Sequence, residues 1–188
     1  MNVAESGATL TKVGGCSGCP DGTAVSNQQV SGSGVLQFST DDSSSLRFVG
    51  LGSGGMGTTP GDVNFAIRLQ GGVAEIRESG AYKSETRFAA GDSFTIAVNN
   101  GAVTYAKNGS VFYTSANTAT TALRGHVIFF DPNGTVRNVG FGSGGSAPAG
   151  DAPVAASPAP ATSTASSAPR GRRSNRAFEN AERLGKFN

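Results

Sequence analysis

Two cysteines, Cys16 and Cys19, lie close together in the segment GGCSGCPDG. Their spacing is the feature of this chain that most directly suggests chemistry. A Cys-x-x-Cys pair can supply half of a zinc site, a redox centre or a small disulfide loop. A structural zinc site needs four ligands, but the chain has a single histidine, His126, and no other cysteine. The strand-to-helix context of a thioredoxin-type redox motif is missing as well. We expect a local disulfide that clamps a turn in an oxidising compartment, or two free thiols in a reducing one.

The other candidate catalytic groups do not form a recognisable constellation. His126 lies in LRGHVIFFD, a pattern typical of a strand, and no serine stands in a nucleophile elbow. Glycoside hydrolysis needs two carboxylates held across a cleft. Asp41 and Asp42 are adjacent in a serine-rich turn, whereas Glu75 and Glu78 lie in a predicted hairpin. The sequence therefore predicts a protein that is not an enzyme and needs no cofactor.

The segment Asp131-Pro132-Asn133-Gly134 places two oxygen ligands in one loop, as a calcium site would. The same four residues are also a typical β-turn sequence. We interpret them as a turn and expect no metal site there.

The segment Gly91–Ser115, GDSFTIAVNNGAVTYAKNGSVFYTS, predicts three antiparallel strands joined by two tight turns. Each turn is an Asn-Gly pair, first Asn100-Gly101 and then Asn108-Gly109. A two-residue type I′ loop needs positive φ at both positions, which Asn tolerates and Gly adopts freely, so these pairs set the strand register. The expected cross-strand pairs are Val98 with Val103, Ile96 with Tyr105, and Tyr105 with Phe112.

This register divides the side chains between two faces of the predicted sheet, because successive residues of a strand point to opposite sides. The apolar face is expected to carry Ile96, Val98, Val103, Tyr105 and Phe112. The smaller and more polar face is expected to carry Thr95, Ala97, Thr104, Ala106, Val111 and Tyr113. We therefore expect Tyr105 and Phe112 in the core, and Tyr113 at least partly exposed together with Tyr82.

Short β-type runs separated by turn residues occupy the rest of residues 1–142, and no helix is predicted before residue 174. About a dozen short strands at this spacing favour an all-β, two-sheet antiparallel β-sandwich. The predicted strands are Thr9–Val13, Ala24–Val30, Gly34–Ser39, Leu46–Leu51, Val63–Leu69, Val73–Arg77, Tyr82–Phe88, Ser93–Val98, Ala102–Lys107, Val111–Thr114, Gly125–Phe130 and Val136–Phe141.

Charge is unevenly distributed along the 188 residues. Residues 1–150 carry a net charge of −1, whereas residues 151–188 carry +3. The near-neutral first part gives no support for a nucleic-acid surface. No apolar run approaches the roughly 20 residues of a membrane-spanning helix, and MNVAESGATL lacks the features of a signal peptide. A cytoplasmic protein, a part of a surface assembly, export by another route and a removed leader all stay open.

The composition changes after Gly142 to a stretch of Gly, Ala, Ser, Thr and Pro. Such a stretch cannot bury enough apolar surface to offset its ordering entropy, so residues 143–173 are predicted to be a disordered linker. Residues 174–188, SNRAFENAERLGKFN, then predict a short, basic, amphipathic helix.

Patterned apolar residues after a long linker suggest a docking peptide that folds on a protein partner. Phe178 and Leu184 would be its apolar anchors, and Arg173 and Arg176 would favour an acidic partner surface. A solvated terminus with chance periodicity is the equal alternative. Contacts of these arginines with nucleic acid or an anionic membrane are a third.

The run G-D-x-F-x-I-A-V-x-x-G-x-V-x-Y-x-K-N-G-x-x-F-Y-T-S resembles the central strands of SPRY-like domains and of related concanavalin-like bacterial modules. The segments LRFVGLGSG and VNFAIRLQGGVAEIRESGAY are similar to such modules too, so the resemblance extends over roughly residues 3–142. It implies a two-sheet, jelly-roll β-sandwich that binds glycans or proteins through its loops or one sheet face, and it implies no catalysis.

The function that these observations favour is a lectin-like recognition module tethered to a larger assembly by its C-terminal helix. Sugar binding would use polar groups that match hydroxyls and an aromatic ring against the apolar face of the sugar. The candidate ligand-binding residues are Glu75, Arg77, Tyr82, Thr95, Thr104 and Tyr113. The alternative is a structural, surface or capsid-associated protein whose sandwich makes subunit contacts.

Overall fold

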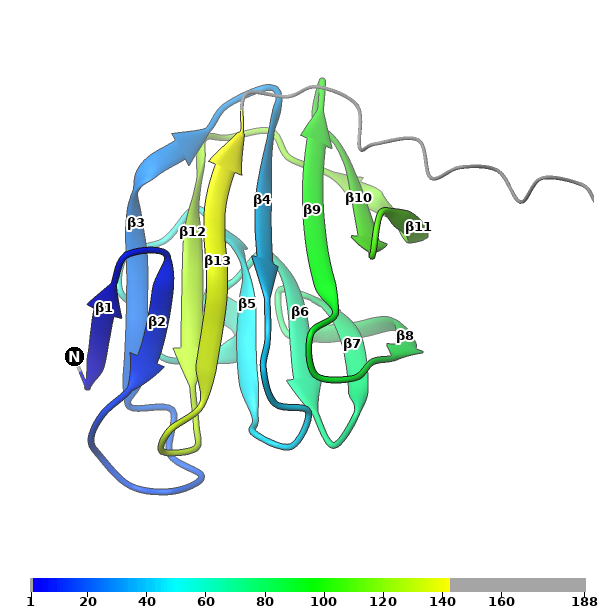
Figure 1. Cartoon of the computed structure of the whole chain (residues 1–188). Helices are drawn as coiled ribbons and strands as arrows, with labels where there is room; N and C mark the ends of the chain where they lie inside the picture. Colours follow the sequence, from blue (N-terminus) through cyan, green and yellow to red (C-terminus); the bar gives the residue numbers. More distant parts are fainter. Residues whose placement is uncertain (1, 143–188) are drawn as a thin grey trace, which may run out of the picture. The chain divides into compact units, whose positions relative to one another are not determined.

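A computed structural model of the chain describes residues 2–142; the predicted linker and C-terminal helix, residues 143–188, lie outside the described residues. Figure 1 shows two antiparallel β-sheets stacked as two layers. The described part also contains one short 3-10 helix, η1 (Pro60–Asp62). No helix within residues 2–142 has the length and apolar character needed to cross a membrane. The prediction of an all-β, two-sheet antiparallel sandwich is confirmed.

One layer is a seven-stranded sheet that contains both predicted Asn-Gly hairpins. Its strands, in spatial order, are β1 (Val3–Ser6), β2 (Thr9–Lys12), β13 (Thr135–Gly142), β4 (Gly34–Ser39), β9 (Ser93–Asn99), β10 (Ala102–Lys107) and β11 (Ser110–Thr118).

The other layer is a six-stranded sheet. Its strands, in spatial order, are β3 (Gly22–Val30), β12 (Leu123–Phe129), β5 (Arg47–Gly52), β6 (Phe65–Gln70), β7 (Val73–Glu78) and β8 (Ala81–Arg87). The twelve predicted strands thus correspond to β2–β13, and β1 is an additional strand that the sequence analysis missed.

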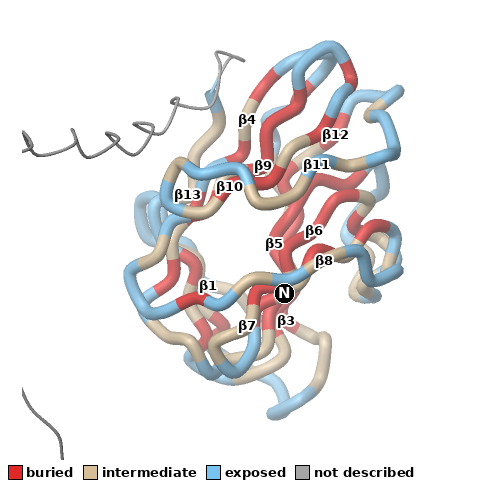
Figure 2. Tube along the Cα trace, turned by 90° about the vertical axis from the view of Figure 1, so that its right-hand side faces the viewer, coloured by how far each residue is buried: buried red, intermediate tan, exposed pale blue. Residues whose placement is uncertain are grey.

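The core lies between the two sheets. Figure 2 shows the buried segments gathered where the layers face each other, with exposed residues mainly in the connecting loops. The central strands contribute inward-facing residues to this space, such as Ile67 and Ile76 from one sheet and Ile96 and Tyr105 from the other, all 0% exposed. The prediction that Tyr105 belongs to the core is confirmed, whereas Phe112 is only partly buried at its edge.

The hairpin β9–β10 has the predicted register. Val98 pairs with Val103, and Ile96 pairs with Tyr105. The loop residue Asn100 has φ of 49° and Gly101 has φ of 83°, the positive values that a type I′ turn requires.

The hairpin β10–β11 begins with the predicted turn but departs from the predicted register. Ala106 still pairs with Val111, but a bulge then places Tyr113 opposite Tyr105, so the predicted pairing of Tyr105 with Phe112 is wrong. A bulge sets two residues of one strand against one of its neighbour and reverses which side chains point inward. Strand β11 is an edge strand, and no further strand holds it in the regular register.

Candidate functional site

The candidate residues of the β7–β8 hairpin come together on the outer face of the six-stranded sheet. Strand β7 alternates between the two sides of the sheet. Ala74 and Ile76 are fully buried between the sheets, whereas Glu75 and Arg77 are partly exposed and project outward.

Glu75 is the centre of an ion cluster on this face. Its Oε1 lies 2.8 Å from Nη1 of Arg68, and its Oε2 accepts hydrogen bonds from Nε and Nη2 of Arg77 at 2.8 and 2.5 Å. Arg68 also donates to the side chain of Gln70. Both bonds from Arg77 converge on one carboxylate oxygen, and because charge-assisted hydrogen bonds are stronger than neutral ones, they restrain the Arg77 guanidinium beside Glu75.

Tyr82 is the exposed aromatic residue of the same surface. It pairs with Arg77 across the hairpin, and the guanidinium carbon of Arg77 lies 5.5 Å from the centroid of the ring, a cation–π contact. The residue is 50% exposed. Partial desolvation and the nearby Glu85 carboxylate raise the pKa of the Tyr82 phenol, so its hydroxyl keeps its proton and can donate a hydrogen bond. The surface combines an accessible ring with fixed polar neighbours.

Thr95 and Thr104 lie on the other side of the sandwich. Both alternate with buried residues of β9 and β10, so they project from the outer face of the seven-stranded sheet. Thr95 pairs with Ala106, and Thr104 pairs with Ala97. The candidate ligand-binding residues therefore lie on two separate surfaces, and one small ligand cannot contact both.

The prediction that Tyr113 shares the outer face of Thr104 is wrong. The bulge in β11 places Tyr113 opposite the inward-facing Tyr105, and their ring centroids are 5.7 Å apart. Tyr113 packs at the margin of the core, although it is partly exposed as expected.

A polar cleft beside Glu78, with a volume of about 280 Å³, was not identified from the sequence. Glu78 is 4% exposed; its Oε1 accepts a hydrogen bond from the Tyr105 hydroxyl at 3.3 Å, and its Oε2 accepts one from the Asn117 amide at 2.7 Å. Burial and the Glu78 charge raise the pKa of Tyr105 far above its ordinary value, so this phenol remains a donor. The alternation after Ala74 and Ile76 was a signal that Glu78 points inward.

A second hollow, of about 260 Å³, lies at the other end of the space between the sheets, where the β1–β2 hairpin faces β3 and β12. Its walls are mainly apolar, with Leu36, Val127 and Phe141 among them. It therefore offers fewer orienting groups for a polar ligand than the Glu78 cleft.

His126 is buried on β12 and has the hydrogen-bond partner expected of a strand histidine. Its Nε2 lies 2.9 Å from the carbonyl oxygen of Gly57 and 3.2 Å from Oγ1 of Thr23. Burial lowers the pKa of His126 and so favours the neutral ring. The contact with Gly57 ties the glycine-rich loop after β5 to the sheet, which is a structural role.

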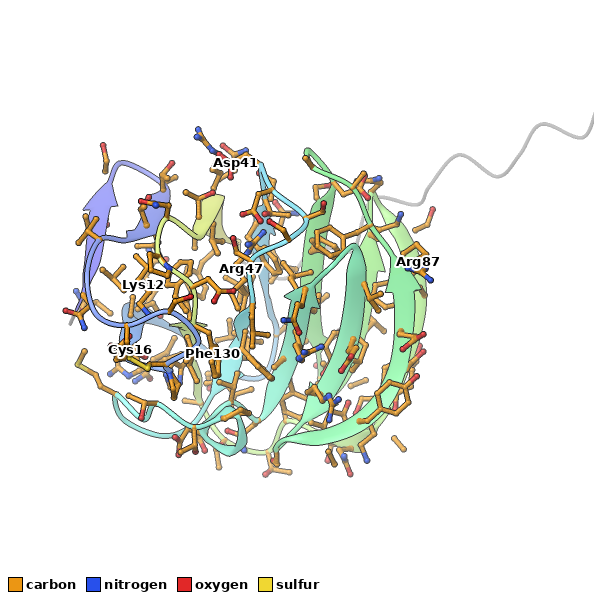
Figure 3. The ribbon with its side chains drawn as sticks, turned by 90° about the horizontal axis from the view of Figure 1, so that it is seen from below. Lys12, Cys16, Asp41, Arg47, Arg87 and Phe130 are labelled. Atoms are coloured by element: carbon orange, nitrogen blue, oxygen red, sulfur yellow. A yellow bond between two sulfur atoms is a disulfide. The ribbon has the colours of Figure 1, made fainter. Side chains whose placement is uncertain are left out.

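Lys12 explains how the two cysteines are positioned. Its side chain is fully buried, and its ammonium group donates to the carbonyl oxygens of Cys16 (2.7 Å), Cys19 (3.1 Å) and Phe130 (2.7 Å). It also lies 2.6 Å from Oδ1 of Asp21. Figure 3 shows Lys12 close to Cys16 and Phe130. The ammonium is surrounded by carbonyl and carboxylate oxygens, much as a bound cation would be.

The sulfurs of Cys16 and Cys19 form a disulfide in the structure, with Cα atoms 5.5 Å apart. Their sulfurs and the Asp21 carboxylate are close enough to one another to be considered as a metal site. The hydrogen bond from Lys12, followed by that from the Cys16 backbone, lowers the pKa of Asp21. Because Asp21 already faces an ammonium group, a divalent cation would meet a like charge there. The residues do not fit a metal.

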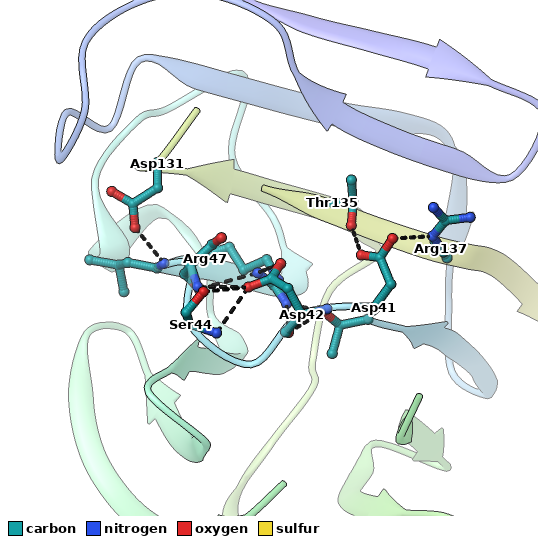
Figure 4. A network of polar contacts seen from close by, with 10 residues as sticks. Asp41, Asp42, Ser44, Arg47, Asp131, Thr135 and Arg137 are labelled. Carbon is teal, nitrogen blue, oxygen red and sulfur yellow. Dashed lines mark hydrogen bonds and ion pairs between the residues drawn. The ribbon is translucent and has the colours of Figure 1, made fainter. Parts of the chain in front are cut away.

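The adjacent carboxylates Asp41 and Asp42 hold loops in place and face different partners (Figure 4). Asp41 accepts hydrogen bonds from the Thr135 hydroxyl and from Nε of Arg137, the latter at 2.6 Å. The Thr135 hydrogen bond is the main cause of the lowered pKa of Asp41. Asp42 lies 2.8 Å from the guanidinium of the fully buried Arg47. Neither carboxylate faces a second one across a cleft.

The interpretation of Asp131–Gly134 as a turn is confirmed. The Gly134 amide donates to the carbonyl oxygen of Asp131 at 3.2 Å. The Asp131 carboxylate accepts hydrogen bonds from the backbone N–H groups of Leu46 and Gly18, at 2.7 and 3.3 Å. It therefore joins three loops.

No protein-family model and no curated protein matches this chain. Solved structures do match. A human SPRY domain has a TM-score of 0.59 at 17% identity, covering 73% of this chain and 94% of that one. The PSpry domain of TRIM65 has a TM-score of 0.53 at 10% identity, covering 74% and 85%. The carbohydrate-binding module CBM66 from Bacillus subtilis has a TM-score of 0.51 at 8% identity, covering 75% and 91%.

These likenesses and the two stacked antiparallel sheets define the class of fold as a concanavalin-like β-sandwich. The SPRY domains among these neighbours share that fold with the chain, as the resemblance of its central strands predicted.

Proposed function

We propose that residues 1–142 are a non-catalytic, lectin-like recognition module that binds a glycan or a protein through the outer face of β6–β8. The observation that carries this proposal is the half-exposed Tyr82 ring, with Arg77 held beside it by Glu75. One structural neighbour is a carbohydrate-binding module, which supports a glycan as the first ligand class to test.

The geometry of this surface supports recognition of a sugar. A pyranose ring would stack on the free face of Tyr82, while the Tyr82 hydroxyl, Glu75 and Arg77 would bond to its hydroxyl groups. The ion cluster holds Arg77 before the ligand arrives, so little side-chain entropy is lost on binding.

The non-catalytic part of the proposal rests on how His126, Asp41 and Asp42 are used. His126 holds a loop, and Asp41 and Asp42 each bind a neighbouring arginine. Glycoside hydrolysis through a carboxylate pair would require two such groups facing one substrate.

A glycan array probed with the full-length protein, followed by titration calorimetry, tests the proposal. Tyr82→Ala is expected to abolish detectable binding because it removes the stacking ring. Thr104→Ala on the opposite face is the matched control and should leave the affinity unchanged. If Thr104→Ala weakens binding and Tyr82→Ala does not, the other sheet carries the site. If no glycan or protein ligand depends on either residue, the proposed site is wrong.

We also propose that residues 174–188 dock on a protein partner and tether the sandwich to a larger assembly. Phe178 and Leu184 would be the apolar anchors, with Arg173 and Arg176 beside an acidic surface of the partner. A fusion of residues 173–188, the proposed helix with Arg173 before it, to an unrelated protein should recover a partner from the host. Phe178→Ala with Leu184→Ala should abolish recovery, whereas Asn180→Ala should not. If the unmodified fusion and both variants recover the partner equally, docking through Phe178 and Leu184 is refuted.

A structural protein with subunit contacts is the second candidate function. The sheets end in the edge strands β1, β11, β3 and β8, and Val111 on β11 is 50% exposed. An unpaired edge can add a strand from another chain. Sedimentation equilibrium at micromolar concentration separates the two functions, because a recognition module needs no self-association.

A further inference from the structure

Glu78 is buried at the end of β7, at the base of the polar cleft described above. The residue is 4% exposed, and it ends the inward-facing row of β7 that begins with Ala74 and Ile76. We propose that this cleft is a second binding site, separate from the Tyr82 surface, and that it binds a primary ammonium group of a ligand.

The charge of Glu78 is not balanced by a nearby cation within residues 2–142, which supports an ammonium ligand. Lys12 and Arg47, the buried cations of the described chain, each lie within 2.8 Å of a carboxylate oxygen. Glu78 forms no ion pair with any residue in the part of the chain that the structure describes; its two partners, Tyr105 and Asn117, are neutral hydrogen-bond donors. A carboxylate in surroundings of low polarity attracts a cation more strongly than one in water.

Glu78 also has hydrogen-bonding capacity that remains unused. A carboxylate has about four lone-pair sites, and Glu78 uses two of them. Asn117 also lines the cleft, together with Ser79, Thr118, Thr120 and Thr121, whose hydroxyl oxygens can accept hydrogen bonds. The lining includes the apolar residues Phe65, Ala119 and Leu123 and contains no Lys or Arg. The free sites on Glu78 and these hydroxyl oxygens are acceptors for the three N–H donors of an ammonium group.

The backbone around Glu78 is held rigidly. Ser79 and Gly80 form a two-residue turn with φ of 47° and 84°, which makes Glu78 and Ala81 the last pair of the β7–β8 hairpin. The Ser79 amide also donates to the carbonyl oxygen of Asn64 at 3.0 Å. The carboxylate is therefore held in place before a ligand arrives, which reduces the entropic cost of binding.

The size of the cleft limits the ligand. A volume of about 280 Å³ is at the lower end of the range for small-molecule pockets, so it fits one side chain or one sugar ring. A lysine side chain and an amino sugar share the required ammonium group. The experiment distinguishes these two sources.

The test is an NMR titration of the full-length, nitrogen-15-labelled protein that follows the Asn117 side-chain amide. The ammonium probes are Nα-acetyl-lysine methylamide and glucosamine. Their neutral counterparts are Nα-acetyl-norleucine methylamide and N-acetylglucosamine. Saturable binding of either ammonium probe, with no binding of its neutral counterpart, supports the proposal and identifies the source. Binding of neither, or equal binding of a neutral counterpart, overturns it.

Substitutions test whether the ammonium probes bind at Glu78. Glu78→Gln keeps the shape but removes the charge, and should weaken binding by at least about tenfold. The control Glu85→Gln removes an exposed carboxylate from β8 and should leave the affinity unchanged. Unchanged affinity in Glu78→Gln refutes the site. If Glu78→Gln does not fold, Thr120→Lys places an ammonium at the exposed rim and should block the probes; undiminished binding in that variant also refutes the site.

Discussion

Replacing Lys12 by methionine should destabilise the sandwich substantially. Methionine keeps an unbranched chain but removes the ammonium group. The carbonyl oxygens of Cys16, Cys19 and Phe130 then lose the ammonium donor, and Asp21 loses its cation. Two of these carbonyls keep a backbone donor, because the Asp21 N–H bonds to Cys19 at 2.9 Å and the Gly18 N–H bonds to Phe130 at 3.0 Å.

The magnitude follows from the hydrogen bonds. A hydrogen bond to a charged group contributes about 1.5–3 kcal/mol net, and an ordinary one about 1 kcal/mol. The Cys19 and Phe130 carbonyls keep a backbone donor and the loop is partly exposed, so we count about 1 kcal/mol for each of the three lost bonds. The expected loss in the free energy of unfolding is therefore about 3 kcal/mol, or roughly 10 °C in melting temperature for a domain of this size. We add nothing for Asp21, because water can reach its carboxylate.

Urea unfolding followed by circular dichroism measures this loss. Lys83→Met, which removes an exposed lysine of β8, is the matched control and should change the free energy by less than about 0.5 kcal/mol. A loss below about 1 kcal/mol in Lys12→Met would show that the ammonium does not organise this loop.

Three further predictions follow. Tyr105→Ala should cost about 3–5 kcal/mol because Tyr105 is fully buried, whereas Tyr82→Ala at a half-exposed position should cost much less; equal losses in urea unfolding would contradict the face assignment. Burial lowers the folded-state pKa of His126 below 6.5, so as the pH falls His126 takes up a proton in the unfolded chain before it does so in the folded protein. Stability should therefore drop by up to about 1.4 kcal/mol between pH 7.5 and 5.5, and His126→Gln should not show this drop. Reducing the Cys16–Cys19 disulfide should cost at most about 2 kcal/mol, since it closes a loop with a sequence separation of 3; a larger shift in reducing buffer would mean that the disulfide does more than close this turn.

Local signals predicted most of the fold. The Asn100-Gly101 loop determined the register of β9–β10, because only a few residue types adopt its backbone conformation. The alternation of apolar residues located twelve strands, since one face of each strand had to be buried. The same signals missed β1, whose four residues carry almost no buried side chain.

The candidate site was predicted less well. Glu75, Arg77 and Tyr82 come together because they belong to one hairpin, whose pairing is local. Tyr113 was misplaced because a bulge has no reliable signature in a single sequence. Glu78 was noticed as a hairpin carboxylate, but its contact with Asn117 joins residues 39 positions apart, and no local pattern reports such a contact.

The sequence by itself determined which residues form strands, where the tight turns lie and which side chains of a strand share a face, because backbone preference and the two-residue period act over a few neighbouring positions. Only the tertiary structure decided that Thr95 and Tyr82 belong to opposite surfaces, that Lys12 is enclosed by the oxygens of distant loops, and that a buried carboxylate faces a polar cleft. These depend on how the two sheets stack, and stacking brings together residues whose separation in the sequence carries no information about their contact.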